Sequence, residues 1–362
     1  MPARHPEPSM TASAFADPTS EIRITTLHAT RGMNFWSKRP VIRMDLAVGE
    51  FESISSADVE QFTSRLVSAL PGLRDHECSI GSPGGFVLRL RRGTYAPHII
   101  EHVALELQTA IGHRVGFGRT RGGDNRGEYT VVFEHDHEQV GMRAAALALE
   151  IVQRAFAGTL DTVEPALTEL EALSKTPDTP PMHQRVFCGI TGGGARAETQ
   201  QELVRRLEAM GRHDPLVIDA SPAYLLQAGL PYTYSEIAII LDENPTDVPD
   251  RYRDIDNARK LLSIVADAVR TDGVVICPAK AWELQDYARD QDLRVAIFRA
   301  DDDITQRDQR VAMAVGRVRD GEIWLERCGD PRSAGPVRED LPAEAQIAAA
   351  LAEYVLSNAC SD

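Results

Sequence analysis

The first half of the chain combines two spacings of apolar positions, a period of two and a period near 3.6. The period of two predicts strands over residues 21–30, 39–48 and 129–135. The helical period predicts helices over residues 56–73, 93–112 and 138–158. Residues 81–94 place apolar positions between glycines and predict a further strand, and the glycine-rich residues 116–128 predict a mobile loop. Residues 21–157 are therefore expected to form an α+β domain.

The second half alternates short, uninterrupted apolar runs with helical segments. The apolar runs lie at residues 185–191, 215–220, 235–242, 273–279 and 293–300. Helical spacing falls between them at residues 197–211, 257–270 and 281–291. Because strands buried on both faces of a parallel sheet carry such runs, we expect residues 185–362 to form an α/β domain with a mostly parallel sheet. Between the two domains, residues 158–184 are expected to be a short acidic helix and a Pro- and Thr-rich linker.

Composition narrows the class of protein. The 362 residues suffice for two or three domains, and 43% hydrophobic with 26% charged residues is typical of a soluble chain. A net charge of −15 argues against a nucleic-acid or anionic-membrane binder. No run of 18 apolar residues predicts a membrane span, and residues 1–20 predict a disordered leader rather than a secretory signal. The five scattered cysteines predict reduced thiols in a cytoplasmic protein.

The predicted helix at 93–112 carries a cluster of candidate metal ligands. His98 and His102 are four residues apart, so both imidazoles leave one face of the helix, and Glu101 lies between them. This HxxEH order is that of the inverted zincins, in which zinc activates a water molecule and the glutamate is the general base. The alternative is that the histidines cap backbone groups or line a wet surface. The Tyr-Ala-Pro start of the helix, which predicts an exposed first turn, favours the metal.

A catalytic zinc needs a third protein ligand. Glu106 would lie about 12 Å along the helix from His98, too far for one ion, and is expected to be a structural or supporting residue. Residues 134–138 (Glu, His, Asp, His, Glu) offer ligands where a strand meets a helix. We favour Glu138 as the third ligand and take Glu134 as the second choice.

Two arginines follow the site helix. Arg119 and Arg121 fall in the glycine-rich loop and are candidates for clamping a substrate carboxylate. A solvated loop with two surface arginines is an equal alternative.

Several stretches of the first half resemble the N-terminal domain of cyanophycin synthetases. They are "TRGMNFWSKRPVIRMDL", "LPGLRDHECSIGSPGGFVLRLRRGTYAPHIIEHVALELQ" and "VGFGRTRGGDNRGEYTVVFEHDHEQVGMRAA", and the resemblance covers residues 22–157. In that family the domain engages the Asp–Arg polymer cyanophycin, and in some members it carries a zinc-peptidase-like centre that clips the polymer into primers. The resemblance thus implies metal roles for His98 and His102 and a base role for Glu101. It also implies a homo-oligomer.

The second half resembles the Mur-ligase-like module of the same synthetases, without their ATP-grasp domain. "SPAYLLQAGLPYTYSEIAIILDENPTD" and "DIDNARKLLSIVADAVRTDGVVICPA" carry this resemblance. The phosphate loop of the module departs from its pattern, which needs a Lys-Ser/Thr pair after the glycines. The glycines remain and the pair is missing; the residues are Gly189, Gly192, Gly193, Gly194, Ala195, Arg196 and Ala197.

Two further departures lie in the same module. Asp242-Glu243-Asn244-Pro245 stands where the family has an acidic residue and a histidine, and "CPAKAWE" replaces its nucleotide stretch. Lys260 is displaced by two positions from the family's functional lysine, where Leu262 stands. We therefore expect a degenerate ligase module that does not use ATP and serves as a scaffold or an oligomerisation surface.

Three hypotheses follow. The first is a zinc-dependent peptidase acting on cyanophycin or a related Asp/Arg-containing polymer or peptide, with Zn²⁺ as its cofactor. The second is a non-catalytic polymer-binding or regulatory partner of a full-length synthetase. The third is an ATP-dependent ligase of altered chemistry that uses Arg196 and the glycines. The sequence favours the first, with no nucleic-acid or membrane partner and a homo-oligomeric assembly.

Overall fold

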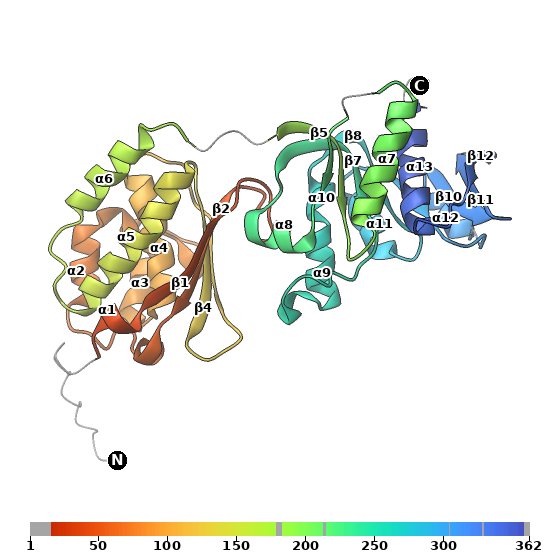
Figure 1. The fold of residues 1–362 in the computed structure, drawn as a ribbon. Helices are drawn as coiled ribbons and strands as arrows, with labels where there is room; N and C mark the ends of the chain where they lie inside the picture. The colour runs from red at the N-terminus through yellow and green to blue at the C-terminus, as the bar shows by residue number, and fades with distance from the viewer. Residues whose placement is uncertain (1–15, 179–182, 213–214, 304, 328, 358–362) are drawn as a thin grey trace, which may run out of the picture. The chain divides into compact units, whose positions relative to one another are not determined.

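The computed structural model describes residues 16–178, 183–212, 215–303, 305–327 and 329–357. The chain divides into two compact units (Figure 1). The first unit holds the elements from α1 to α6, and the second holds those from β5 to α13. Residues Arg31–Phe35, between β1 and β2, belong to the second unit.

The first unit is an α+β fold built on an antiparallel sheet. Across the sheet its strands are β1 (Arg23–Ala29), β2 (Val41–Ala47), β4 (Glu128–Glu134) and β3 (Gly118–Gly122). Its helices are α1 (Pro18–Glu21), α2 (Phe62–Ala69), α3 (Gly85–Arg92), α4 (Ala96–Ala110), α5 (Glu138–Phe156) and α6 (Glu164–Ser174). Helices α4 and α5 pack on each other and against the sheet, α4 on β3 and β4 and α5 on β1 and β2 (Figure 1).

The core of this unit explains why the helices lie there. Helix α4 buries an apolar stripe that includes Ile99, Val103 and Leu107. Three aromatic rings meet at the C-terminal end of α5. The ring of Phe156 contacts Phe51 at 5.1 Å and Phe62 at 4.6 Å between ring centroids. Removing such apolar area from water is the main force that holds helices on a sheet.

Two predictions for this unit are wrong. Residues 81–94 form helix α3 instead of a strand, because Phe86 and Leu90, one turn apart, are both fully buried while the arginines of the last turn face solvent. Residues 118–122 form strand β3 instead of a loop, because they pair with β4 from Gly118↔Phe133 to Gly122↔Tyr129. Residues 118–122 become a strand through this pairing with β4, which the spacing of apolar residues within the segment does not predict.

The second unit is an α/β fold with a mostly parallel sheet, as predicted. Across the sheet its strands are β12 (Asp330–Pro336), β11 (Glu322–Arg327), β10 (Ala314–Arg319), β9 (Arg294–Phe298), β8 (Val269–Pro278), β7 (Tyr232–Ile240), β5 (His183–Thr191) and β6 (Val217–Asp219). Strands β6, β5, β7, β8, β9 and β10 run parallel, and the hairpin of β11 and β12 continues the sheet in antiparallel pairing.

The helices of this unit lie between the parallel strands, except the last, which follows β12. They are α7 (Arg196–Ala209), α8 (Pro222–Ala228), α9 (Ile255–Leu262), α10 (Ile264–Asp267), α11 (Trp282–Asp290), α12 (Gln306–Val311) and α13 (Ala343–Ser357). Helix α13 packs beside α7 (Figure 1). Both helices contribute apolar side chains to the core of the unit, among them Leu203, Leu207, Ile347 and Leu351.

The predictions for the leader, the linker and the cysteines concern residues of which only some are described by the structure. Residues 1–15 of the expected leader lie outside it, and Pro18–Glu21 form α1, which Asp17 caps by accepting a hydrogen bond from the Thr19 amide at 2.9 Å. Helix α6 of the expected linker packs on α5. Cys78, Cys188 and Cys277 are free thiols, and the other two cysteines lie outside the described residues. Within the described ranges, no helix is long and apolar enough to cross a membrane.

Candidate functional site

The predicted site helix is α4, and it brings the three predicted residues to one side. Pro97 occupies its first turn, where a missing amide proton costs nothing. His98, Glu101 and His102 share the face that lines a large cavity, while the apolar residues between them enter the core. The i, i+3, i+4 spacing thus places these three side chains as the sequence predicts.

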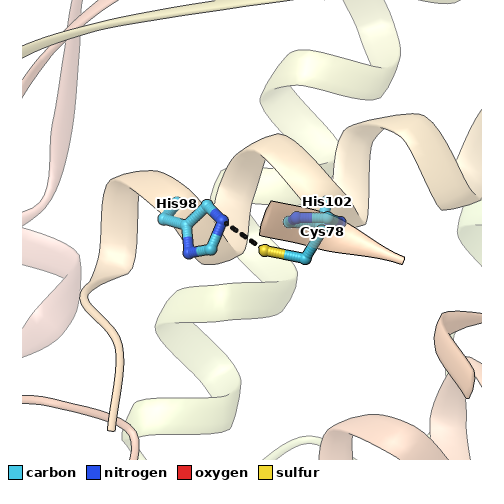
Figure 2. A group of neighbouring side chains, drawn as sticks. All are labelled: Cys78, His98 and His102. Atoms are coloured by element: carbon cyan, nitrogen blue, oxygen red, sulfur yellow. Dashed lines mark hydrogen bonds between the residues drawn. The ribbon is translucent and has the colours of Figure 1, made fainter. Parts of the chain in front are cut away.

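Cys78 joins His98 and His102 in a group that could hold a metal ion. Its Sγ and one nitrogen each of His98 and His102 lie within 4.8 Å of one another (Figure 2). Cys78 Sγ is 3.4 Å from His98 Nε2, and His98 Nδ1 is 2.8 Å from Thr94 Oγ1. Cys78 adopts a left-handed φ of 53°, which is uncommon for a residue with a side chain and gives this turn its local direction.

Burial keeps both imidazoles neutral. Burial, with a smaller effect of the nearby Arg89 charge, lowers the pKa of His98 to about 4. Burial first, and then the neighbouring His98 and His76, lowers the pKa of His102 to about 2. At neutral pH each ring therefore keeps an unprotonated nitrogen, which is the form that binds a metal.

Behind His102 lies a chain of polar contacts that the sequence did not reveal. His76 Nδ1 is 2.8 Å from His102 Nδ1, and His76 Nε2 is 3.0 Å from Glu106 Oε2. The Phe86 ring stacks on His102 at 3.9 Å between centroids. Glu106 thus supports the site through His76, an arrangement that fixes the orientation of a ligand ring. The sequence offered one signal for this contact, namely a histidine and a cysteine only two residues apart, His76 and Cys78.

Glu101 lies beside this set, and its environment favours the neutral form. Its side chain is 6% exposed and receives a 2.5 Å hydrogen bond from Thr120 Oγ1. Burial raises the pKa of Glu101 to about 7, against the opposing effect of the Thr120 bond. A Cβ on Gly118 would lie 2.8 Å from Glu101 Cγ, so glycine is required where β3 passes the carboxyl group. Glu101 can therefore exchange a proton near neutral pH.

The cavity that joins these residues has a volume of about 1210 Å³. Its wall is formed by the turns before α3, by α4 and by β3, and it carries charges of both signs. The charged lining residues are Asp75, Glu77, Glu101, Glu106, Arg89 and Arg119. Arg119 lines the cavity, whereas Arg121, two residues further along β3, is not part of its lining. Both arginines sit on a strand rather than on the expected loop.

The predicted third ligands have other partners. Glu134 accepts hydrogen bonds from Arg39 at 3.0 Å, from Ser37 at 3.2 Å and from two backbone amides. The Glu138 amide, in the first turn of α5, donates to Asp178 at 3.0 Å. The structure therefore does not bring Glu138 or Glu134 into the group of His98 and His102, where Cys78 lies instead.

The glycine loop of the second unit connects β5 to α7 and holds a carboxylate of its own chain. Gly193 N donates to Asp242 Oδ1 and Oδ2 at 3.0 and 3.1 Å, and Gly194 N donates to Oδ2 at 3.2 Å. Arg196 pairs with Asp219 at 2.9 Å and also bonds the Gly192 carbonyl. Backbone amides that would otherwise face a phosphate are thus occupied by Asp242.

Gly189 and Lys260, two further residues singled out in the sequence, lie beside aromatic side chains. Gly189 lies inside β5, where a Cβ would meet the Tyr232 hydroxyl. Lys260 Nζ lies 4.4 Å from the centre of the Phe35 ring. Neither observation supplies the missing lysine of a phosphate loop.

Comparison with known proteins bears on the first unit. Residues 41–157 match the family model of the cyanophycin synthase-like N-terminal domain. Cyanophycin synthetase of Synechocystis sp. is 42% identical over 143 residues, which cover 39% of this chain and 16% of the relative. That of Trichormus variabilis is 43% identical over 136 residues, or 36% and 15% of the two chains. The resemblance of the first half is confirmed, and the chain matches less than a fifth of the length of these relatives.

Solved structures resemble about half of this chain, and only distantly. MurF from Acinetobacter baumannii aligns with a TM-score of 0.33 and 13% identity over 49% of this chain and 43% of that one. The UDP-N-acetylmuramate:L-alanyl-gamma-D-glutamyl-meso-diaminopimelate ligase from Neisseria meningitides gives a TM-score of 0.30 and 15% identity over 50% and 63%. Similarity at this level says nothing about activity.

The names of the relatives correct the functional prediction. The matched family and the relatives carry the name of a synthetase, which is a ligase and not a peptidase. The prediction of a zinc-dependent peptidase is therefore wrong. The relatives are thus named as ligases, whereas the degenerate glycine loop of this chain argues against an ATP-dependent ligase.

Proposed function

We propose that the chain takes part in ligation of the cyanophycin-synthetase type, and that its first unit holds the Asp/Arg-containing peptide that is lengthened. The observation that carries the proposal is the mixed charge of the cavity. Arg89 and Arg119 are exposed cations, and Asp75 and Glu77 are exposed anions at the same cavity. None of the four side chains makes a hydrogen bond or ion pair within the described residues.

A peptide of aspartate and arginine presents matching groups. Its free carboxylates suit the guanidinium groups of Arg89 and Arg119, which bind carboxylates in a planar, bidentate way. Its guanidinium groups suit Asp75 and Glu77. Because exposed ion pairs are individually weak, several are needed to give useful affinity, and the cavity offers both signs together.

The same proposal includes a metal ion at Cys78, His98 and His102. One thiol and two neutral imidazoles are the donor set that zinc prefers, and three protein ligands leave one position open. The contact of His102 with His76, itself bonded to Glu106, orients one ligand ring. When bound, zinc supplies positive charge and an open coordination position that suits a peptide carboxylate.

Titration calorimetry tests the binding half of the proposal. A soluble Asp/Arg oligomer is titrated into the zinc-loaded chain, into the Arg89→Ala/Arg119→Ala double variant and into Arg154→Ala, which removes an exposed arginine of α5 outside the cavity. We expect saturable binding by wild type and by Arg154→Ala, and at least about tenfold weaker binding by the double variant. Absence of binding by wild type, or equal binding by all three proteins, would contradict it.

The ligase half has a separate test. A full-length cyanophycin synthetase is supplied with ATP, Mg²⁺, aspartate, arginine and the same oligomer, with and without this chain. Wild-type chain should increase the rate of oligomer extension, and the double variant should not. Identical rates with wild type and the variant would remove the ligase context while leaving the binding result intact.

A further inference from the structure

We propose that the peptide binds as an added β-strand along the outer edge of β3. This inference rests on the proposed function, because it specifies how the cavity holds its peptide. It concerns the backbone of the ligand, whereas the charged groups of the cavity concern its side chains.

Strand β3 is an edge strand with a defined set of free backbone groups. It pairs with β4 on one side and ends the sheet on the other. Glu134 N donates to Phe117 O at 2.9 Å, and Gly123 N donates to Glu128 O at 2.6 Å. In an antiparallel pair every second residue directs its backbone N–H and C=O to the partner strand, so the backbone groups of Arg119 and Arg121 also point to β4. The amide and carbonyl groups of the residues between them, 118, 120 and 122, point to the outer edge.

The outer edge is open to an approaching backbone. Gly122, and Gly116 just before the strand, are exposed to solvent. Thr120, between them, turns its hydroxyl to Glu101. Proteins usually cover or interrupt such edges because unpaired N–H and C=O groups recruit another strand. Here glycines leave the edge accessible beside a cavity.

The edge and the candidate metal ligands share that cavity. Residues 116–120 line it together with His98 and Cys78. A strand rises about 3.3 Å per residue, so an edge of five residues holds about five residues of an extended peptide. A peptide lying there runs past Glu101 and the ligand set without any rearrangement of the sheet.

The two faces of β3 suit alternate side chains of such a peptide. Gly118 and Thr120 share the face that meets Glu101, and the Thr120 hydroxyl donates to the Glu101 carboxyl group. Arg119 and Arg121 share the opposite face, are exposed, and make no ion pair within the described part of the chain. Side chains of an added strand also alternate, so arginine-like groups can face Glu101 and carboxylates can face the two arginines.

Gly122 allows a matched pair of variants. Gly122→Pro removes an outward amide proton and no β3–β4 hydrogen bond, and the glycine does not have a left-handed φ. Gly122→Ala is the control, since it adds a side chain and keeps the amide. We expect Gly122→Pro to bind the Asp/Arg oligomer about fivefold to tenfold more weakly than Gly122→Ala, which should resemble wild type.

A second measurement needs no variant. Two oligomers carry N-methyl groups on alternate backbone amides, one on the odd and one on the even positions. A strand added to β3 forms hydrogen bonds through the backbone amides of alternate residues only. Wild type should therefore bind one of the two oligomers clearly more weakly than the other. Equal binding of both oligomers, with equal binding by Gly122→Pro and Gly122→Ala, would overturn the edge-strand inference while leaving the proposed function standing. Absence of any binding by wild type would overturn both.

Discussion

Replacing Glu101 by glutamine should change how the stability of the first unit depends on pH. Burial raises the pKa of Glu101 from 4.5 to about 7 in the native chain. Glutamine has nearly the same shape, can keep a hydrogen bond to Thr120 and does not titrate in this range. The comparison of wild type with Glu101→Gln therefore isolates the proton on this carboxyl group.

The sign follows from where the proton is bound. Between pH 4.5 and about 7 the native carboxyl group keeps a proton that the unfolded chain has released. The stabilising contribution of Glu101 is thus fully present below pH 4.5 and is lost as the pH rises through 7. At about 1.4 kcal/mol per pH unit, the loss over the whole range is about 3 kcal/mol. From pH 5.5 to pH 8, a range that avoids protonating the many other carboxylates, it is about 2 kcal/mol.

The assay is urea unfolding of the EDTA-treated chain at pH 5.5, 6.5, 7.5 and 8. Trp36 in the first unit reports the transition when Trp282 and Trp324 of the second unit are replaced by Phe. The histidine shifts run in the opposite direction but are common to both proteins and cancel in the difference. Metal must be removed because a bound cation would favour the ionised carboxylate.

Relative to wild type, Glu101→Gln should gain about 2 kcal/mol in the free energy of unfolding between pH 5.5 and pH 8. Glu60→Gln, which removes an exposed carboxylate of the same unit, should show no such gain. Parallel pH profiles for wild type and Glu101→Gln would refute the reasoning, because Glu101 would then be ionised in the native chain as readily as in the unfolded one.

Three further results follow from the contacts described. Cys78→Ala should lower bound zinc, measured by elemental analysis after dialysis, well below the wild-type ratio, with Cys188→Ala, a buried thiol of the second unit, unchanged; equal zinc in all three would exclude Cys78 as a ligand. Glu202→Ala should lower the free energy of unfolding of the second unit by about 1 to 2 kcal/mol, because its 1% exposed carboxylate pairs with three arginines, two of them more than 40% exposed; a loss under about 0.5 kcal/mol would disagree. Asp242→Ala should free the amide of Gly193 for binding an anion. Inorganic pyrophosphate should therefore raise the melting temperature of the variant and not that of wild type. A rise in wild type alone would show that Asp242 does not block the loop.

The site helix was predictable because its information is local. The apolar spacing of residues 93–112 defines α4 to within a few residues, and the i, i+4 rule places His98 and His102 side by side. The parallel strands of the second unit were predictable for a similar reason, since a strand buried on both faces reads as an apolar run.

The parts that were missed depend on contacts between distant segments. Cys78 lies 20 residues before His98 and reaches it through a left-handed turn that has no pattern in the sequence. The strand character of residues 118–122 comes from pairing with β4, and its glycines and arginines have low strand propensity. The third ligand was sought after α4 because position in the sequence suggested it, whereas the fold brings Cys78, from before α4, to the two histidines.

The central claim is that an Asp/Arg-containing peptide binds in the cavity of the first unit. Hydrogen exchange of the full chain, read by mass spectrometry with and without a soluble Asp/Arg oligomer, tests it most directly. The account predicts slower exchange in residues 75–79 and at the outward amides of residues 118–122, with the second unit unchanged. Protection confined to the second unit, or no protection at an oligomer concentration that saturates binding, would contradict it.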